Sequence, residues 1–195
     1  NWSAMLAVMN PTDFTENNPF GSYSVGGQLG YSNDGGSAFL NLLYGDQDGN
    51  YEDEGLGEGA GATFQVDLTT GWDLSDSFYL GLNTTYNTTD GGDGGEDFGF
   101  YGAALYAQLA VSDAFAIGVR PEYFSEFGYF GAIGATDAAG DADVFAVTLS
   151  GNAKVGPLTF IPEFRIDSAS EEAFLNDFEP QKSLASFLLA AVYSF

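Results

Sequence analysis

The last twelve residues constrain the fold of this chain more than any other stretch. From Leu184 to Phe195 the side chains alternate between two rows. One row is small or mixed, and the other is apolar throughout: Ala185, Phe187, Leu189, Ala191, Tyr193 and Phe195. A period of two is typical of a β-strand, because successive side chains point to opposite faces. The segment therefore predicts a strand with one apolar face and an aromatic residue at its end.

Such a strand suits two architectures. Its apolar face packs into the core of a soluble β-sandwich, or it faces lipid in a barrel, where aromatic side chains gather at the membrane interfaces. A soluble protein rarely finishes on an exposed phenylalanine, so we favour the closing strand of an outer-membrane barrel. Within it, the predicted signal for the barrel assembly machinery is Phe187, Leu189, Tyr193 and Phe195.

Nine earlier segments also alternate, at about 2–10, 22–32, 37–44, 62–74, 78–87, 98–111, 115–125, 144–153 and 158–166. Links after the odd-numbered segments are long and mostly acidic, and links after the even-numbered ones are tight. Outer-membrane barrels have this asymmetry, with short periplasmic turns and longer outside loops. We predict a single all-β domain over residues 1–195, an antiparallel transmembrane barrel of about ten strands in a Gram-negative outer membrane, with extracellular long loops and periplasmic termini. Pro121 and Pro162 fall within predicted strands, where proline weakens the ladder.

Charge and composition exclude several functions. The chain has 28 acidic and 4 basic residues, a formal net charge of -24, so it cannot neutralise the phosphates of a nucleic acid. It contains neither histidine nor cysteine. The common zinc sites and serine-histidine catalysis require imidazole, and thiolate sites require cysteine, so we predict that the protein is not an enzyme.

Charged residues recur on the inward rows of two predicted strands, at Arg120, Glu122, Glu163 and Arg165. The strand between them offers small inward residues there, so the four side chains are predicted to form one ladder along the barrel wall. The ladder is either a charged constriction or a network that braces the wall. Two further inward acids, Asp67 and Asp73, give the lumen a surplus of negative charge.

The acidic link after the third segment copies the opening of an EF-hand loop, with oxygen ligands at Asp46, Asp48, Asn50 and Glu52. Tyr51 stands where glycine is required, and Gly57 stands where the bidentate glutamate belongs, so this is not an EF-hand. A looser Ca²⁺ site and a solvated loop remain the two alternatives. No other cofactor is predicted.

Two strand motifs carry a family resemblance. Residues 120–125 read Arg-Pro-Glu-Tyr-Phe-Ser, and residues 162–167 read Pro-Glu-Phe-Arg-Ile-Asp, with Phe174 following. Together with the strand ending at Phe195, they resemble the OmpL-like putative β-barrel porins of Gram-negative bacteria. The resemblance covers about the last 80 residues. Because members of that group look longer, it implies that this chain forms the C-terminal part of a larger barrel.

These observations lead to two functional hypotheses. The first is a passive, cation-preferring channel for small hydrophilic solutes, surrounded by membrane lipid. The second is a non-conducting barrel that serves as an accessory or structural subunit of an outer-membrane complex. Bulky inward residues favour the filled barrel of the second hypothesis: Phe39, Leu43, Tyr79, Tyr106 and Phe124. Inward glycines favour an open lumen: Gly26, Gly30, Gly81, Gly102 and Gly118.

Overall fold

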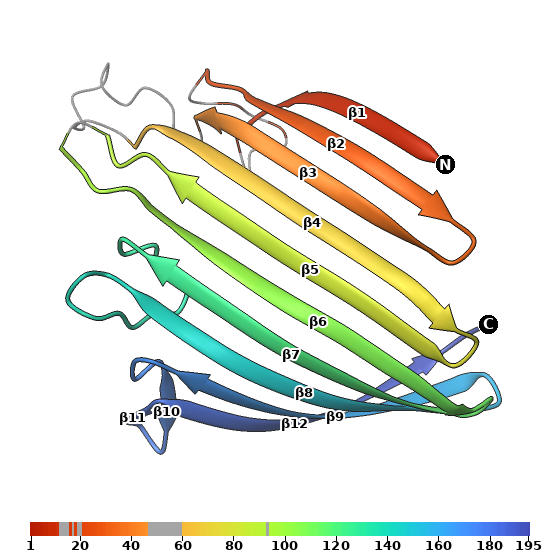
Figure 1. Ribbon diagram of the computed structural model, residues 1–195. Helices are drawn as coiled ribbons and strands as arrows, with labels where there is room; N and C mark the ends of the chain where they lie inside the picture. The colour runs from red at the N-terminus through yellow and green to blue at the C-terminus, as the bar shows by residue number, and fades with distance from the viewer. Residues whose placement is uncertain (12–15, 17, 19–20, 47–59, 93) are drawn as a thin grey trace.

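The computed structural model describes residues 1–11, 16, 18, 21–46, 60–92 and 94–195. It is an antiparallel sheet of ten strands in chain order (Figure 1). The strands are β1 (Trp2–Met9), β2 (Ser24–Asn33), β3 (Gly36–Asp46), β4 (Ala62–Ser75), β5 (Phe78–Thr89), β6 (Phe98–Ser112), β7 (Phe115–Phe127), β8 (Ala142–Val155), β9 (Leu158–Ala169) and β12 (Ser183–Tyr193). The all-β antiparallel prediction is confirmed. Among the described residues, no helix has the length and hydrophobicity needed to cross a bilayer.

The links follow the predicted asymmetry. Four two-residue turns, 34–35, 76–77, 113–114 and 156–157, lie at one end of the sheet, and the long links lie at the other (Figure 1). Local polar groups fix the turns: the Asn33 side chain accepts a hydrogen bond from the Gly35 amide at 2.9 Å, and Ser75 Oγ accepts one from the Phe78 amide at 3.1 Å. Both chain ends lie at the end with the short turns.

The last link differs from its prediction as a loop from Asp167 to Gln181. Strand β9 continues to Ala169, because its pairing with β12 reaches Ser168 and its pairing with β8 reaches Ala169. The link itself contains a small hairpin of β10 (Phe174–Asn176) and β11 (Glu179–Gln181). Its turn residues, Asp177 and Phe178, have φ angles of 51° and 68°, as the two central residues of a type I′ turn require.

One face of the sheet, here called the apolar face, carries the predicted apolar rows of all ten strands. The register keeps these rows aligned across neighbouring strands, as in Leu29 opposite Leu40 and Leu40 opposite Leu68. Their side chains are uncovered, with Leu6 92% and Phe187 70% exposed, and no second sheet packs on them within the described residues. A sandwich would bury such rows between two sheets, so the soluble alternative is wrong.

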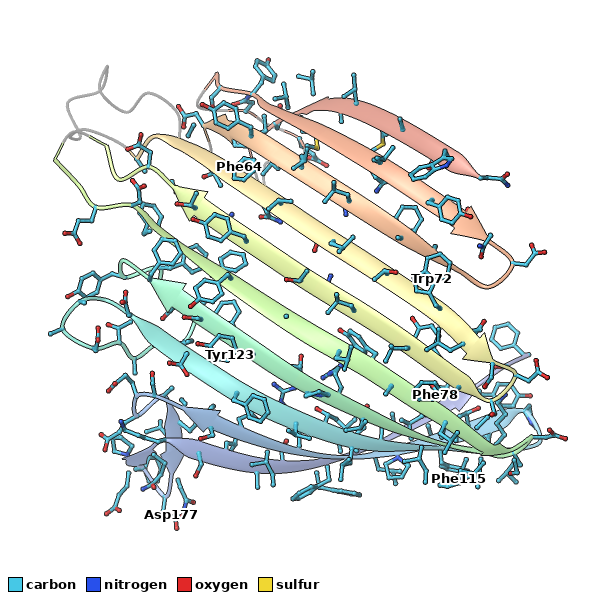
Figure 2. All side chains as sticks on the ribbon, viewed as in Figure 1. Phe64, Trp72, Phe78, Phe115, Tyr123 and Asp177 are labelled. Carbon is cyan, nitrogen blue, oxygen red and sulfur yellow. The ribbon has the colours of Figure 1, made fainter. Side chains whose placement is uncertain are left out.

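Aromatic side chains border the apolar face at both ends. Toward the long links they are Tyr44, Phe64, Tyr86, Tyr101, Tyr123 and Phe145, and toward the short turns Trp2, Tyr31, Trp72, Phe78, Phe115, Phe160 and Tyr193. Figure 2 shows Phe64 and Tyr123 near the first end and Trp72 and Phe115 near the second. On β4 the two aromatics lie eight residues apart, or about 27 Å at a rise of roughly 3.4 Å per residue. At a strand tilt of about 35–45° this spacing projects to about 20 Å along the membrane normal, close to the apolar band of roughly 25 Å in membrane barrels.

The two mid-strand prolines interrupt pairing on one side only. Pro121 pairs with Val147 of β8, but the β6–β7 register skips from Ala104 opposite Glu122 to Ala107 opposite Val119. Pro162 pairs with Leu189 of β12, while the β8–β9 register is interrupted beside it. Since proline has no N–H to donate, each ladder is missing bonds on the side toward which that N–H would point.

Strands β1 and β12 form the two edges of the sheet, and among the described residues they do not pair with each other. Strand β1 runs from the short-turn end toward the long-link end, and β12 runs the opposite way. The two edges therefore have the antiparallel directions that closure of a barrel requires.

Candidate functional site

The face opposite the aromatic borders, here called the polar face, brings charged residues of β7 and β9 together across β8. Arg120 and Arg165 both lie opposite Thr148 in the register, and Glu122 and Asp167 both lie opposite Ala146. Because Thr148 and Ala146 are small, they leave room for the longer side chains to meet above them.

Arg165 is the centre of this group. Its Nη1 donates to Glu122 Oε2 and, at 3.3 Å, to Thr148 Oγ1. Its Nε donates to Asp167 Oδ1 at 2.8 Å, and its Nη2 lies 2.8 Å from the same oxygen. Bonds between ionised groups are about twice as strong as neutral ones. The guanidinium therefore ties β7 to β9 across the intervening strand.

Arg120 has a looser attachment. Its Nε lies 3.1 Å from Glu122 Oε2, which is close enough for an ion pair, but the N–H is not aligned for a hydrogen bond. Its guanidinium carbon lies 5.8 Å from the centre of the Tyr106 ring, within the range of a cation–π contact. Glu122 is thus shared between two arginines. We call Arg120, Glu122, Arg165 and Asp167 the ion cluster.

The structure thus contains part of the predicted ladder. The structure brings Arg120, Glu122 and Arg165 together, whereas Glu163 makes no ion pair or hydrogen bond with the described residues. Asp167 replaces it, and sequence reasoning missed this residue because it placed Asp167 in a loop. The spacing of Arg165 and Asp167 held the signal, since residues two apart on a strand share a face.

A second polar region covers β2 to β5, where neutral donors surround one carboxylate. Asp67 Oδ1 accepts from Asn41 Nδ2 at 2.8 Å, and Asp67 Oδ2 accepts from Thr85 Oγ1 at 2.8 Å and Asn83 Nδ2 at 3.2 Å. Thr69 Oγ1 adds a longer bond at 3.3 Å. Gln28 extends the chain by donating to Asn41 Oδ1 at 2.7 Å. We call these six residues the amide network.

The other predicted inward acid, Asp73, lies apart from both groups. It pairs with Tyr79 near the end of β4 and is exposed beside the 76–77 turn. The structure therefore places Asp67 and Asp73 on one face but at different depths, six residues apart along the same strand.

The predicted Ca²⁺ site falls mostly beyond the part of the chain that the structure describes. Asp46 is the last residue of β3, and Asp48, Asn50 and Glu52 lie outside the described residues. Within the described residues, no group of three or more carboxylates could hold a metal ion. The calcium site stays a prediction.

Glu126 on β7 was not singled out from the sequence, and it is fully buried. Its Oε2 accepts hydrogen bonds from the backbone amides of Ala132 at 2.5 Å and Ile133 at 3.2 Å, both in the 128–141 link. Close by, the Phe130 ring of this link lies 4.9 Å from Phe100, which is itself 5.5 Å from Phe124. Glu126 thus holds the link against the polar face at the long-link end.

An uncovered apolar band between two aromatic borders, backed by a charged polar face, defines a transmembrane β-barrel protein. The chain belongs to the family described as putative beta-barrel porin-2, OmpL-like, whose model matches residues 1–195. The match therefore extends well beyond the 80 residues on which the sequence resemblance rested. No curated protein matches the chain. Family membership identifies it as a porin-like β-barrel of the outer membrane.

Proposed function

We propose that this protein is a channel through which small hydrophilic solutes diffuse passively, with a preference for cations. In this proposal the polar face lines the pore, the long links lie outside a Gram-negative cell, and both termini are periplasmic. The observation that carries the proposal is the distribution of charge on the polar face. Membership of a porin family favours a channel over an enzyme.

The charges do not cancel along the pore lining. Two arginines balance Glu122 and Asp167 in the ion cluster, so its formal charge is zero. Asp67 and Glu163 have no basic partner among the described residues, and Asp73 adds a third negative charge near the short turns. Fixed negative charge in a confined, poorly screened pore favours cations. The acidic links raise the cation concentration at its mouth.

Planar-bilayer recording tests the proposal. We expect purified, folded protein to produce discrete current steps, with a reversal potential under a salt gradient that indicates cation selectivity. A gel shift between unheated and boiled samples confirms folding, because a closed sheet with internally paired backbone groups resists detergent. Folded protein that gives no steps would overturn the channel proposal.

One observation favours the alternative of a non-conducting accessory barrel. The 128–141 link folds onto the polar face over Phe100 and Phe124, and bulky side chains there reduce the open area. The same recording separates the two functions. If no conductance appears, co-purification of the folded barrel with other outer-membrane subunits becomes the expected result.

We also propose that Phe187, Leu189, Tyr193 and Phe195 act as the assembly signal. All four side chains are exposed on the apolar face or just beyond it, and the Tyr193 and Phe195 rings lie 6.2 Å apart. Deletion of Phe195 should greatly lower the amount of folded protein in the membrane. Phe178→Ala is the matched control, because Phe178 is equally exposed but lies in the β10–β11 turn. Equal membrane levels for both variants would refute the signal.

A further inference from the structure

A hollow of about 210 Å³ opens on the polar face beside Arg120 of the ion cluster, on the side of the short turns. Strands β5 to β9 contribute to its lining, which includes Tyr79, Tyr106, Gln108, Arg120, Ser150 and Glu163. The space of the hollow depends on small residues in its lining, because a Cβ atom added at Gly118 would lie only 2.6 Å from Ser150 Oγ. The size suits a molecule of a few heavy atoms, below the range typical of drug-sized ligands.

Two opposite charges in this lining have unused bonding capacity. Arg120 has five N–H donors, and among the described residues none of them makes an aligned hydrogen bond. Glu163 makes neither an ion pair nor a hydrogen bond there, although it faces the same hollow. Arg165 differs, because Glu122, Asp167 and Thr148 already occupy its donors.

The register sets the spacing of these charges. Gly118 lies opposite Ser150, which lies opposite Glu163, so Glu163 and Arg120 are two strands apart and offset by two residues. Their α-carbons are therefore about 12 Å apart, given strand spacings of roughly 4.8 Å and a rise of roughly 3.4 Å. Side chains stand roughly perpendicular to a sheet, and Arg120 and Glu163 form no ion pair with each other, so a gap remains between their charged ends.

We infer that this hollow is a binding subsite for small zwitterions such as amino acids and dipeptides. The ligand carboxylate binds the Arg120 guanidinium, and its ammonium group binds Glu163. Tyr79 adds an aromatic wall that attracts an ammonium ion, while the Tyr106 ring contacts the Arg120 guanidinium. The inference rests on the proposed function, because solutes reach the hollow through the pore.

A zwitterion fits the hollow better than a singly charged solute does. An anion that pairs with Arg120 lies beside the carboxylates of Glu122 and Glu163, which repel it. A cation that pairs with Glu163 leaves the spare donors of Arg120 without a partner. A zwitterion satisfies both groups and leaves the formal charge of the site unchanged.

Isothermal titration of the folded protein in detergent micelles tests the subsite with three probes of equal length: 4-aminobutyrate, butyrate and butylamine. We expect 4-aminobutyrate to bind at least tenfold more tightly than either singly charged probe. Arg120→Gln and Glu163→Gln should each reduce its affinity to that of the singly charged probes. Asp113→Asn, which removes an exposed acid in the 113–114 turn, should leave the affinity unchanged.

Glu163→Gln keeps the test decisive even if Arg120→Gln fails to fold, because Glu163 has no partner to lose among the described residues. If butylamine binds as tightly as 4-aminobutyrate, the hollow is a plain cation site and the inference is wrong. A protein that conducts ions but binds no 4-aminobutyrate also overturns the inference and leaves the channel proposal intact. If 4-aminobutyrate binds to folded protein that never conducts, the subsite is supported and the channel proposal is wrong.

Discussion

On β2 to β5 one carboxylate is surrounded by amides and hydroxyls, whereas on β7 to β9 two carboxylates are held by two guanidinium groups. The neutral donors around Asp67 stabilise its negative charge without cancelling it. In the ion cluster, charge is cancelled by charge. The amide network therefore leaves a net negative charge on the polar face, whereas the ion cluster carries no net formal charge.

The backbone beneath the two regions also differs. Pairing between β3 and β4 is continuous below the amide network. Beside the ion cluster, Pro121 and Pro162 interrupt the β6–β7 and β8–β9 ladders. Arg165 joins β7 to β9 directly through Glu122. We therefore expect the cluster to brace a stretch of sheet where backbone hydrogen bonds are missing, whereas the network lies on strands whose pairing is continuous.

Arg165→Met should have the largest effect on stability. It leaves the nearly buried Asp167 without its cation and removes the link between β7 and β9. Loss of one partner from a fully buried pair costs roughly 3–5 kcal/mol. Because Arg165 is about a third exposed, we expect about 2 kcal/mol, measured by urea unfolding in lipid vesicles.

Arg120→Met is the matched control for that measurement. Arg120 makes one unaligned ion pair, so its loss should cost less than about 1 kcal/mol. Equal destabilisation by the two substitutions would mean that the bridge through Arg165 has no special role in bracing the sheet.

Asp67→Asn should have an intermediate effect. The amide retains the shape of the side chain, but it places an NH₂ group among donors that require an acceptor. We expect a loss of about 1 kcal/mol in the same urea experiment. Asp73→Asn is the control, since Asp73 is exposed beside a turn and should change stability very little. If the Asp67→Asn protein were as stable as the wild type, the hydrogen bonds of the amide network would contribute no more to stability than those of a solvated surface.

The smallest expected effect is that of acid pH on the stability of the 128–141 link, which lies outside both regions of the sheet. Backbone N–H groups of Asp141 and Ala139 donate to the Asp137 carboxylate at 3.0 and 2.9 Å, and they hold its pKa below the ordinary value of 3.8. A lowered folded pKa stabilises the link above pH 3.8, and this contribution disappears as the pH falls through the folded pKa.

Hydrogen exchange of the Ala139 and Asp141 amides measures this effect. Above about pH 5, exchange in the wild type should be slower than in Asp137→Asn, and the ratio should approach one in stronger acid. A ratio of exchange rates that stays constant across the pH range would show that the charge of Asp137 does not stabilise the link.

Much of the fold follows from the sequence, because the alternation of side chains marks the strands and the length of each link marks the end of the sheet at which it lies. The rows ending at Phe195, the ten strands and the side-dependent link lengths all appear in the structure. Side-chain partners follow only in part. The meeting of Arg165 and Glu122 across small residues of β8 was predicted, but the place of Asp167 beside Arg165 was not, because the end of β9 depends on its pairing with β8 and β12. Glu126 was missed because its partners are backbone amides of the link that directly follows β7, and backbone amides leave no mark in the residue pattern.

The decisive measurement of cation preference is the reversal potential across a planar bilayer under a KCl gradient. We expect cation preference at low salt, arising from both the acidic links and the pore lining. The contribution of the links should fade as the Debye length falls from about 10 Å at 0.1 M to about 3 Å at 1 M, while the contribution of the lining persists.

The same recording with Glu122→Gln and Glu163→Gln combined isolates the lining. These substitutions leave the ion cluster with two arginines against Asp167 and remove the unpaired acid of the hollow. Selectivity should therefore shift toward anions even at 1 M salt, in protein whose gel shift confirms folding. Absence of cation preference in the wild type at low salt, or a high-salt reversal potential that the double substitution leaves unchanged, would contradict the account.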